Sequence, residues 1–260
     1  MRQRIKTTIR SFPRLFDALK RMSRVMGSPD PAYEFFSRYS RMRGNRVNFL
    51  QIGAADGMRN DPFREFIVGG WRGILVEPIP QAFELLKANY SHLADRLTLL
   101  NVAVTREDGS MTLYAFDAQF LAGLPVEQRL DYLRKVSFDR AHVEHYLPAD
   151  QYWAITQTTV PCLSIGTLLA RHWDGSPIHL LAIDAEGHEP EIIAGIDFKT
   201  FVPETIFYES HTLKSTDSAR LTELLAAHGY ESFAVLGDTV AMQAHVLAEY
   251  RDMERKRRGH

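Results

Sequence analysis

The turn after the first predicted strand constrains the fold most strongly. An apolar run from Val47 to Ile52 ends at Gly53, and a second glycine, Gly57, follows four residues later. Short apolar runs that end in glycine are typical of buried parallel strands. Small residues on the following turn let a ligand approach the backbone. The segment therefore predicts a ligand-binding turn at one edge of a parallel sheet.

Apolar runs and amphipathic stretches alternate along the rest of the chain. Strands are predicted at 47–52, 73–76, 97–104, 178–183 and 205–208, and helices at 80–90 and 220–228. Two more strands, 231–236 and 239–243, flank a Gly-Asp turn and predict a terminal antiparallel hairpin. Together they predict a Rossmann-like α/β fold, with a mostly parallel seven-stranded sheet and helices on both faces.

Three segments lie outside this alternation. Residues 1–45 form a basic extension that begins as an amphipathic helix, residues 110–161 interrupt the core domain at 46–246, and residues 247–260 form a basic tail. Segments inserted at the carboxyl ends of strands commonly cover a substrate. The insertion is also rich in aromatic residues, which would equally well pack as a small core of their own.

Charge and cysteine content limit the partners and the compartment. The formal net charge is −1, so the chain has no excess of positive charge to gather nucleic acid. Cys162 is the single cysteine, and the sequence has no long apolar run, so we expect a cytoplasmic protein. The basic N-terminal helix leaves two interpretations open: peripheral contact with the inner face of the membrane, or packing on its own domain or in a homodimer.

Acidic residues after the glycine turn indicate the kind of nucleotide. Asp56 and Asp61 would repel the pyrophosphate of NAD and attract the ammonium group of S-adenosylmethionine (SAM). The turn also lacks the third glycine of the dinucleotide-binding pattern G-x-G-x-x-G. The charge of this loop favours SAM.

Two further strand ends complete a predicted nucleoside site. Glu77 ends the second strand 24 residues after Gly53, where a carboxylate can accept hydrogen bonds from two ribose hydroxyls. Asn101 and Ala103 lie at the end of the third strand, and we expect them beside the adenine, because parallel strands deliver their carboxyl ends to one crevice.

Acids and histidines follow the next two predicted strands. Asp184 ends the fourth strand and Glu209 the fifth; His188 and His211 come soon after them. We expect these side chains, with Glu186, on the acceptor side of the crevice. His188 is the first candidate for a general base, because histidine titrates in the useful range, and His211 is the substitute.

Two other roles stay open for the acids. Asp184 and Glu209 offer hard oxygen ligands that could hold Mg²⁺ while an acceptor hydroxyl completes the shell. Glu186 and Glu189 would instead cap the following helix, which has Pro190 near its start and a dipole that favours acids there.

Four motifs in order resemble the FkbM family of SAM-dependent methyltransferases. They are QIGAADG at 51–57, VEP at 76–78, NVA at 101–103 and DAEGHE at 184–189, the last followed by Gly195. The resemblance covers about residues 47–211 and implies a class I methyltransferase fold, SAM as methyl donor, and frequent O-methylation in natural-product or glycan pathways. The family's usual acidic residue before the glycine turn is Gln51 here, which leaves the contact to the methionine end to other groups.

The expected function is therefore SAM-dependent O-methylation of a hydroxyl on a small molecule, natural product or glycan. Three alternatives remain. A carboxyl O-methyltransferase would need no base, because its acceptor is already ionised. A non-catalytic SAM-binding module would show no turnover, and an NAD-dependent oxidoreductase would need the missing third glycine.

Overall fold

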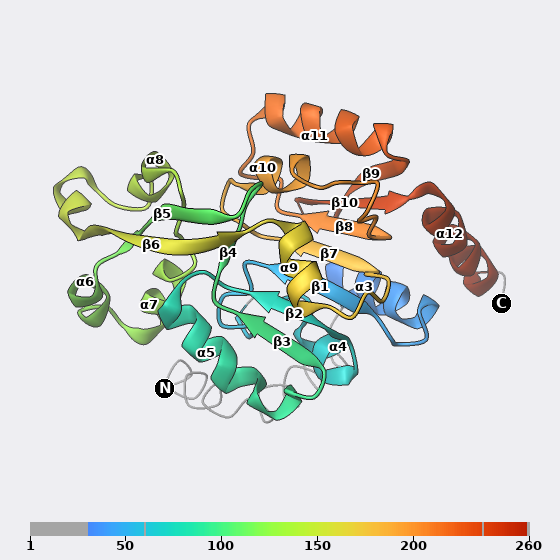
Figure 1. The fold of residues 1–260 in the computed structure, drawn as a ribbon, viewed down its shortest axis with the longest axis horizontal. Coiled ribbons are helices and arrows are strands. Elements are labelled where there is room, and N and C mark those ends of the chain that lie inside the picture. The colour runs from blue at the N-terminus through green and yellow to red at the C-terminus, as the bar shows by residue number, and fades with distance from the viewer. Residues whose placement is uncertain (1–30, 60, 236, 259–260) are drawn as a thin grey trace.

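The computed structural model describes residues 31–59, 61–235 and 237–258 of the chain. Its main sheet has the strand order β3-β2-β1-β7-β8-β10-β9 (Figure 1). Five strands run parallel: β1 (Asn48–Ile52), β2 (Arg72–Val76), β3 (Leu97–Leu100), β7 (Leu180–Ile183) and β8 (Thr205–Tyr208). β10 (Asp238–Gln243) runs antiparallel to β8 and to β9 (Tyr230–Val235). The predicted seven-stranded sheet with a terminal hairpin is confirmed.

Helices cover both faces of this sheet, because alternate side chains of each strand point to opposite sides. Phe49 of β1 joins one buried cluster and its neighbour Leu50 joins the other. The first cluster is completed by α3 (Pro31–Met42), α4 (Arg64–Gly69), α5 (Pro80–Tyr90) and α12 (Ala244–Arg258). The second is completed by α9 (Ile165–His172), α10 (Glu189–Ala194) and α11 (Ser215–Ala227). A short 3₁₀ helix, η1 (Ser91–Leu93), follows α5.

The predicted third strand, 97–104, is divided between two sheets. β3 ends at Leu100, and β4 (Ala103–Val104) pairs instead with β6 (Ile155–Leu163) in a second sheet of order β4-β6-β5, where β5 is Gly109–Phe116. The chain leaves the main sheet at Asn101, whose side chain donates to the carbonyls of Glu77 and Pro78. The prediction of one continuous strand was therefore wrong, because apolar pattern alone does not show which sheet a residue joins.

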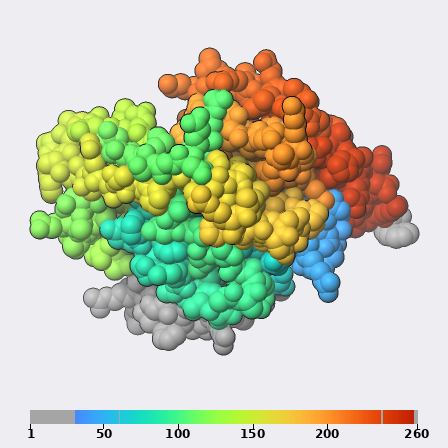
Figure 2. All heavy atoms as spheres, in the orientation of Figure 1, coloured from blue at the N-terminus to red at the C-terminus, as the bar shows by residue number. Residues whose placement is uncertain are grey.

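The segment between β5 and β6 forms a lobe of its own (Figures 1 and 2). It contains α6 (Ala118–Ala122), α7 (Val126–Tyr132), α8 (Arg140–Glu144) and the 3₁₀ helix η2 (Ala149–Ala154). Five buried residues hold it together: Phe116, Leu121, Val143, Leu147 and Ala154. The aromatic rings of the insertion pack around this small core, for example Phe116 against Tyr132 at 4.7 Å between ring centres.

The two ends of the described chain pack side by side. Phe36 and Tyr39 of α3 are fully buried, and an ion pair of 2.7 Å joins Arg38 of α3 to Glu254 of α12. The described part of the predicted basic tail, residues 247–258, thus lies within a helix that begins at Ala244. The amphipathic helix predicted over the first two dozen residues lies outside the described residues. Among the helices described, none is long and apolar enough to cross a membrane.

Candidate active site

Two adjoining cavities lie where the parallel strands end. The Glu77 cavity holds about 620 Å³ of space, part of it open to solvent, and is lined by Val76, Glu77, Pro78, Val102, Ala103 and Phe138 among others. The Glu209 cavity holds about 1030 Å³ by the same measure, and its lining includes Gln51, Asp61, Phe63, Phe207, Glu209 and Asp238. Both share Gly53, Ala55, Arg134 and Asp184. The two cavities therefore form one crevice, partly open to solvent, along the carboxyl ends of the parallel strands.

The first glycine of the turn is required by a close approach of two strands. Gly53 has a φ of 80°, and a side chain there would collide with the backbone carbonyl of Asp184. The N–H groups of Gly53 and Ala54 both donate to Val76 O, at 2.9 and 3.0 Å. Backbone rather than side chain therefore forms this part of the cavity wall. Gly57, also predicted for the site, packs against α5 instead and lines neither cavity.

Glu77 lies at the end of β2 and is 5% exposed. One carboxylate oxygen accepts from Ala55 N and the other from Ile79 N, each at 2.8 Å. Burial raises the pKa of this carboxyl to about 7, although both hydrogen bonds act in the opposite direction. Each oxygen keeps lone-pair capacity for a ligand hydroxyl. Asn101 steadies the backbone of this turn and does not line the cavity, whereas Ala103 does.

The two loop acids have different positions. Asp56 accepts hydrogen bonds from Met58 N and Arg59 N, both at 2.9 Å, and lines neither cavity. Asp61 is 7% exposed and lines the Glu209 cavity, where it accepts from Phe63 N at 2.8 Å. The structure therefore gives Asp56 a role in the loop and brings the charge of Asp61 to the site.

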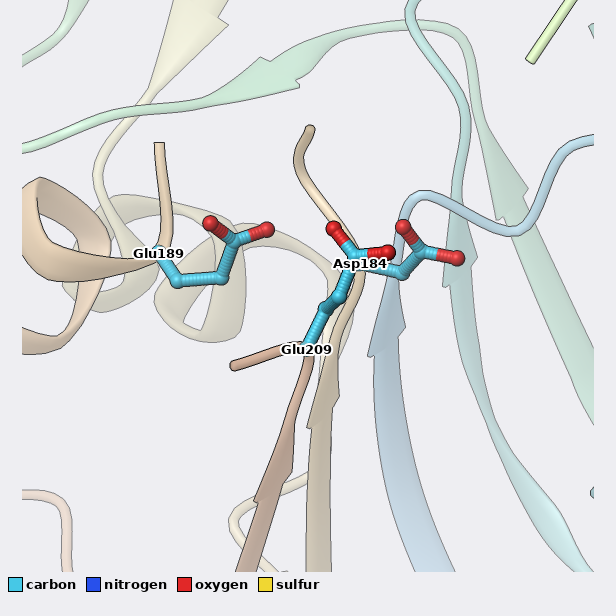
Figure 3. A group of neighbouring side chains, drawn as sticks. All are labelled: Asp184, Glu189 and Glu209. Atoms are coloured by element: carbon cyan, nitrogen blue, oxygen red, sulfur yellow. The ribbon is translucent and has the colours of Figure 1, made fainter. Parts of the chain in front are cut away.

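Three carboxylates gather at the ends of β7 and β8. One oxygen each of Asp184, Glu189 and Glu209 lies within 4.8 Å of the others (Figure 3). Glu189 is fully buried and accepts from Ala185 N at 2.7 Å and Gly187 N at 3.0 Å, so it holds the turn in shape. Burial is the largest cause of the raised pKa values, about 7 for Glu189 and Glu209 and about 6 for Asp184, and the neighbouring acids add to it.

His188 lies on the other side of this turn. The two residues before it, Glu186 and Gly187, adopt left-handed backbone with φ values of 49° and 96°. The His188 ring contacts Phe138 at 5.0 Å between ring centres and lines a separate surface cavity beside Met111. Burial lowers its pKa. The structure thus does not bring the first-choice base to the crevice, because a strand-end position alone does not fix where a turn residue points.

His211 lies beside the Glu209 cavity. Its Nε2 is 3.5 Å from Glu209 Oε1, its Nδ1 is 3.3 Å from Asp238 Oδ1, and its side chain is 60% exposed. Burial lowers the pKa of His211, but the hydrogen bond to Asp238 and the charges of Glu209 and Asp238 outweigh it, and the net shift is upward. Glu209 and Asp238 both line the cavity. The pair formed by Glu209 and His211 can therefore accept a proton at the edge of this cavity.

Sequence patterns did not indicate several residues of the site. Arg134 comes from the insertion and lines both cavities, and His142, also from the insertion, pairs with Glu186 at 3.1 Å. Neither lies at a strand end or in a motif.

Gln51 is 7% exposed, and its Oε1 has no hydrogen-bond partner within the described part of the chain. A buried acceptor without a partner costs about 1–3 kcal/mol, which a ligand donor would recover.

Comparisons with known proteins agree with these motifs. The Methyltransferase FkbM domain family matches residues 51–232. None of the curated proteins matches the chain in sequence.

Similar solved structures include three methyltransferases. Methyltransferase FkbM from Methylobacillus flagellatus KT is 13% identical, with a TM-score of 0.47, over 76% of this chain and 44% of that one. This chain therefore spans less than half the length of that protein. The O-methyltransferase from Bacillus cereus, in complex with SAH, is 12% identical, with a TM-score of 0.41, over 87% of this chain and 88% of that one. Precorrin-6y C5,15-methyltransferase from Geobacter metallireducens GS-15 is 14% identical, with a TM-score of 0.36, over 79% of this chain and 87% of that one.

Proposed function

Because the chain belongs to the FkbM methyltransferase family, we propose that it transfers the methyl group of SAM to a hydroxyl oxygen of a small-molecule or glycan acceptor. The observation that carries this proposal is the pair of cavities that meet at Gly53 and Asp184. One cavity offers a buried carboxylate between apolar walls, and the other offers several acidic groups. A nucleoside and a positively charged end fit these two environments.

The residues present fit SAM. In the Glu77 cavity, Glu77 would accept hydrogen bonds from the ribose hydroxyls, and Val102 and Phe138 offer apolar surface for the adenine. In the Glu209 cavity, the unpartnered Oε1 of Gln51 and the carboxylate of Asp61 are acceptors for the ammonium group. When bound, SAM supplies an electrophilic methyl group on its sulfonium. The protein then has to orient the acceptor and exclude water.

The proton of the acceptor hydroxyl needs a base, because an alcohol is a poor nucleophile near neutral pH. We assign this role to the pair of Glu209 and His211. The carboxylate of Glu209 lines the cavity and has a pKa raised to about 7 by burial, which is near the operating pH. His211 lies 3.5 Å from it and can pass the proton to solvent, since its ring is exposed.

The acidic crevice argues against two of the alternatives. A carboxylate acceptor would enter beside Asp184, Glu209 and Asp238 and would be repelled by them. The pyrophosphate of NAD would meet the same charges. A neutral, hydroxyl-bearing acceptor avoids this cost.

Metal-assisted deprotonation is a second candidate mechanism, because Asp184, Glu189 and Glu209 lie within ligand distance of one another. Glu189 already accepts two backbone N–H groups, so Asp184 and Glu209 would be the main ligands for a Mg²⁺ ion. Dialysis against a chelator separates the two mechanisms. Activity that survives supports the base, and activity that is lost and returns with Mg²⁺ supports the metal.

The direct test is methyl transfer by the purified protein from isotopically labelled SAM. The acceptors are hydroxylated metabolites, sugars and matched carboxylic acids, and mass spectrometry locates the labelled methyl group. We expect label on a hydroxyl oxygen. Label only on carboxylic acids would overturn the choice of acceptor, and SAM binding without any transfer would favour the non-catalytic module.

Membrane contact and a homodimer stay predictions, because they concern residues 1–30, outside the described part.

A further inference from the structure

Acidic residues outnumber basic ones in the lining of the Glu209 cavity. Asp61, Asp184, Glu209 and Asp238 line it. These acids suit the ammonium and sulfonium groups of SAM, but they oppose the carboxylate at its methionine end. A carboxylate enters such a site only beside a cation. In the lining of this cavity, as far as the structure describes it, the cations are Arg59 and Arg134.

Arg59 is already neutralised by α7. Its Nη1 donates to the carbonyl of Glu127 at 2.7 Å and lies 3.3 Å from the carboxylate of the same residue. Its Nη2 lies 2.9 Å from Asp131. Two acids therefore compensate one guanidinium, and binding a third carboxylate would require Arg59 to give up one of them.

Arg134 has more capacity for a ligand. Its Nη1 donates to the carbonyl of Arg59 at 2.7 Å, which fixes the position of the side chain. Its remaining ionic contact, from Nη2 to Asp184 Oδ2, is long at 3.4 Å. A guanidinium carries five N–H donors in a planar fork that matches a carboxylate. Arg134 also lines both cavities, as Gly53 and Ala55 do, so a ligand that spans the two cavities passes it.

We propose that Arg134 binds the carboxylate of the methionine moiety of SAM. This inference rests on the proposed function, because it takes SAM as the ligand of the two cavities. Arg134 follows α7 within the inserted lobe. The lobe therefore supplies part of the cofactor site, and the long contact to Asp184 is the one that the ligand carboxylate replaces.

Two ligands without a transferable methyl group test this inference by calorimetry. S-adenosylhomocysteine has the amino-acid end, and 5′-methylthioadenosine lacks it but keeps the adenosine and the thioether sulfur. With Arg134→Gln, we expect the affinity for S-adenosylhomocysteine to fall about 10- to 100-fold. The affinity for 5′-methylthioadenosine should change less than about twofold. Arg134→Lys should lie between, because it keeps the charge and loses the planar fork.

Lys135→Gln is the matched control. Lys135 is the next residue, lies over the rings of Tyr132 and Tyr146, and lines neither cavity. Its variant removes one positive charge from the same segment and should leave both affinities unchanged. Thermal melting of each variant shows whether it is folded. If Arg134→Gln is unfolded, the affinities of Arg134→Lys for the same two ligands test the role of Arg134 instead.

The outcomes separate this inference from the proposed function. A selective loss of S-adenosylhomocysteine affinity supports the role of Arg134. An equal loss for both ligands, or no loss, overturns it while the SAM site stands. If the wild-type protein binds neither ligand, the proposed SAM site fails, and the role of Arg134 fails with it.

Discussion

The carboxylate of Glu77 accepts a hydrogen bond from the backbone N–H of Ala55 at 2.8 Å, so the end of β2 holds the turn that follows β1. Ala55 has a φ of 46°, which is uncommon for a residue with a side chain and costs about 1–3 kcal/mol, a cost that contacts with neighbours must offset. Glu77 therefore shapes the glycine turn as well as offering acceptors to a ribose. This double role makes it the most informative residue to change.

Glu77→Gln should lower SAM affinity about 10-fold or more, because the amide loses one acceptor and its NH₂ opposes a backbone donor. Calorimetry measures the affinity. Glu84→Gln is the control. Glu84 is exposed on α5, so this variant should bind SAM with the affinity of the wild type. Wild-type affinity in Glu77→Gln would contradict the assignment of the nucleoside cavity.

His211→Gln should reduce kcat about 100-fold or more while SAM affinity is retained, because general base catalysis contributes about 10²–10⁴-fold. His188→Gln should stay within about twofold of the wild type, because His188 lines neither cavity. Steady-state kinetics with an identified acceptor measure both. The reverse ranking of the two variants would restore His188 as the base.

SAM affinity should rise between about pH 6 and about pH 8. Burial raises the pKa of Glu77 to about 7, and burial with the charge of Glu186 raises that of Asp184 to about 6. Raised pKa values mean that these acids still hold protons near the lower pH, and a cationic ligand binds the ionised forms. The protons must therefore leave on binding. Calorimetry in buffers of different ionisation enthalpy measures their release, and a pH-independent affinity would contradict this reasoning.

Gly53→Ala should destabilise the fold and abolish SAM binding, because the new methyl group meets the carbonyl of Asp184 and the φ of 80° is strained for alanine. Gly166→Ala is the matched control. Gly166 lies in α9 with open space around it, so alanine there should leave the melting temperature unchanged or raise it. Equal melting temperatures of the two variants would show that the turn tolerates a side chain.

Local sequence patterns could predict the main sheet because its strands are short and apolar. The predicted strand at 205–208 and the predicted helix at 80–90 agree with β8 and α5 in both bounds. β6 was not predicted, since its first half contains the polar run 156–159 and the strand is partly exposed. The sequence alternates like a strand at 111–116, within β5, but β5 pairs with β6 over a long distance in the sequence, so the second sheet was not predicted.

The site could be predicted only where strand ends determine it. Glu77, Asp184 and Glu209 end buried strands, and topology brings them to one edge. Arg134 and His142 reach that edge through the packing of the insertion, which no local pattern encodes. His188 shows the opposite difficulty, because it follows a strand end in the sequence but lines neither cavity, after left-handed backbone at Glu186 and Gly187.

The most direct test of the central claim is calorimetric titration of the wild-type protein with SAM and, separately, with NAD. The geometry of the two cavities predicts saturable, micromolar binding of SAM and no measurable binding of NAD, whose pyrophosphate would meet Asp61 and Asp184. Binding of NAD in preference to SAM, or no binding of SAM, would contradict the proposed function.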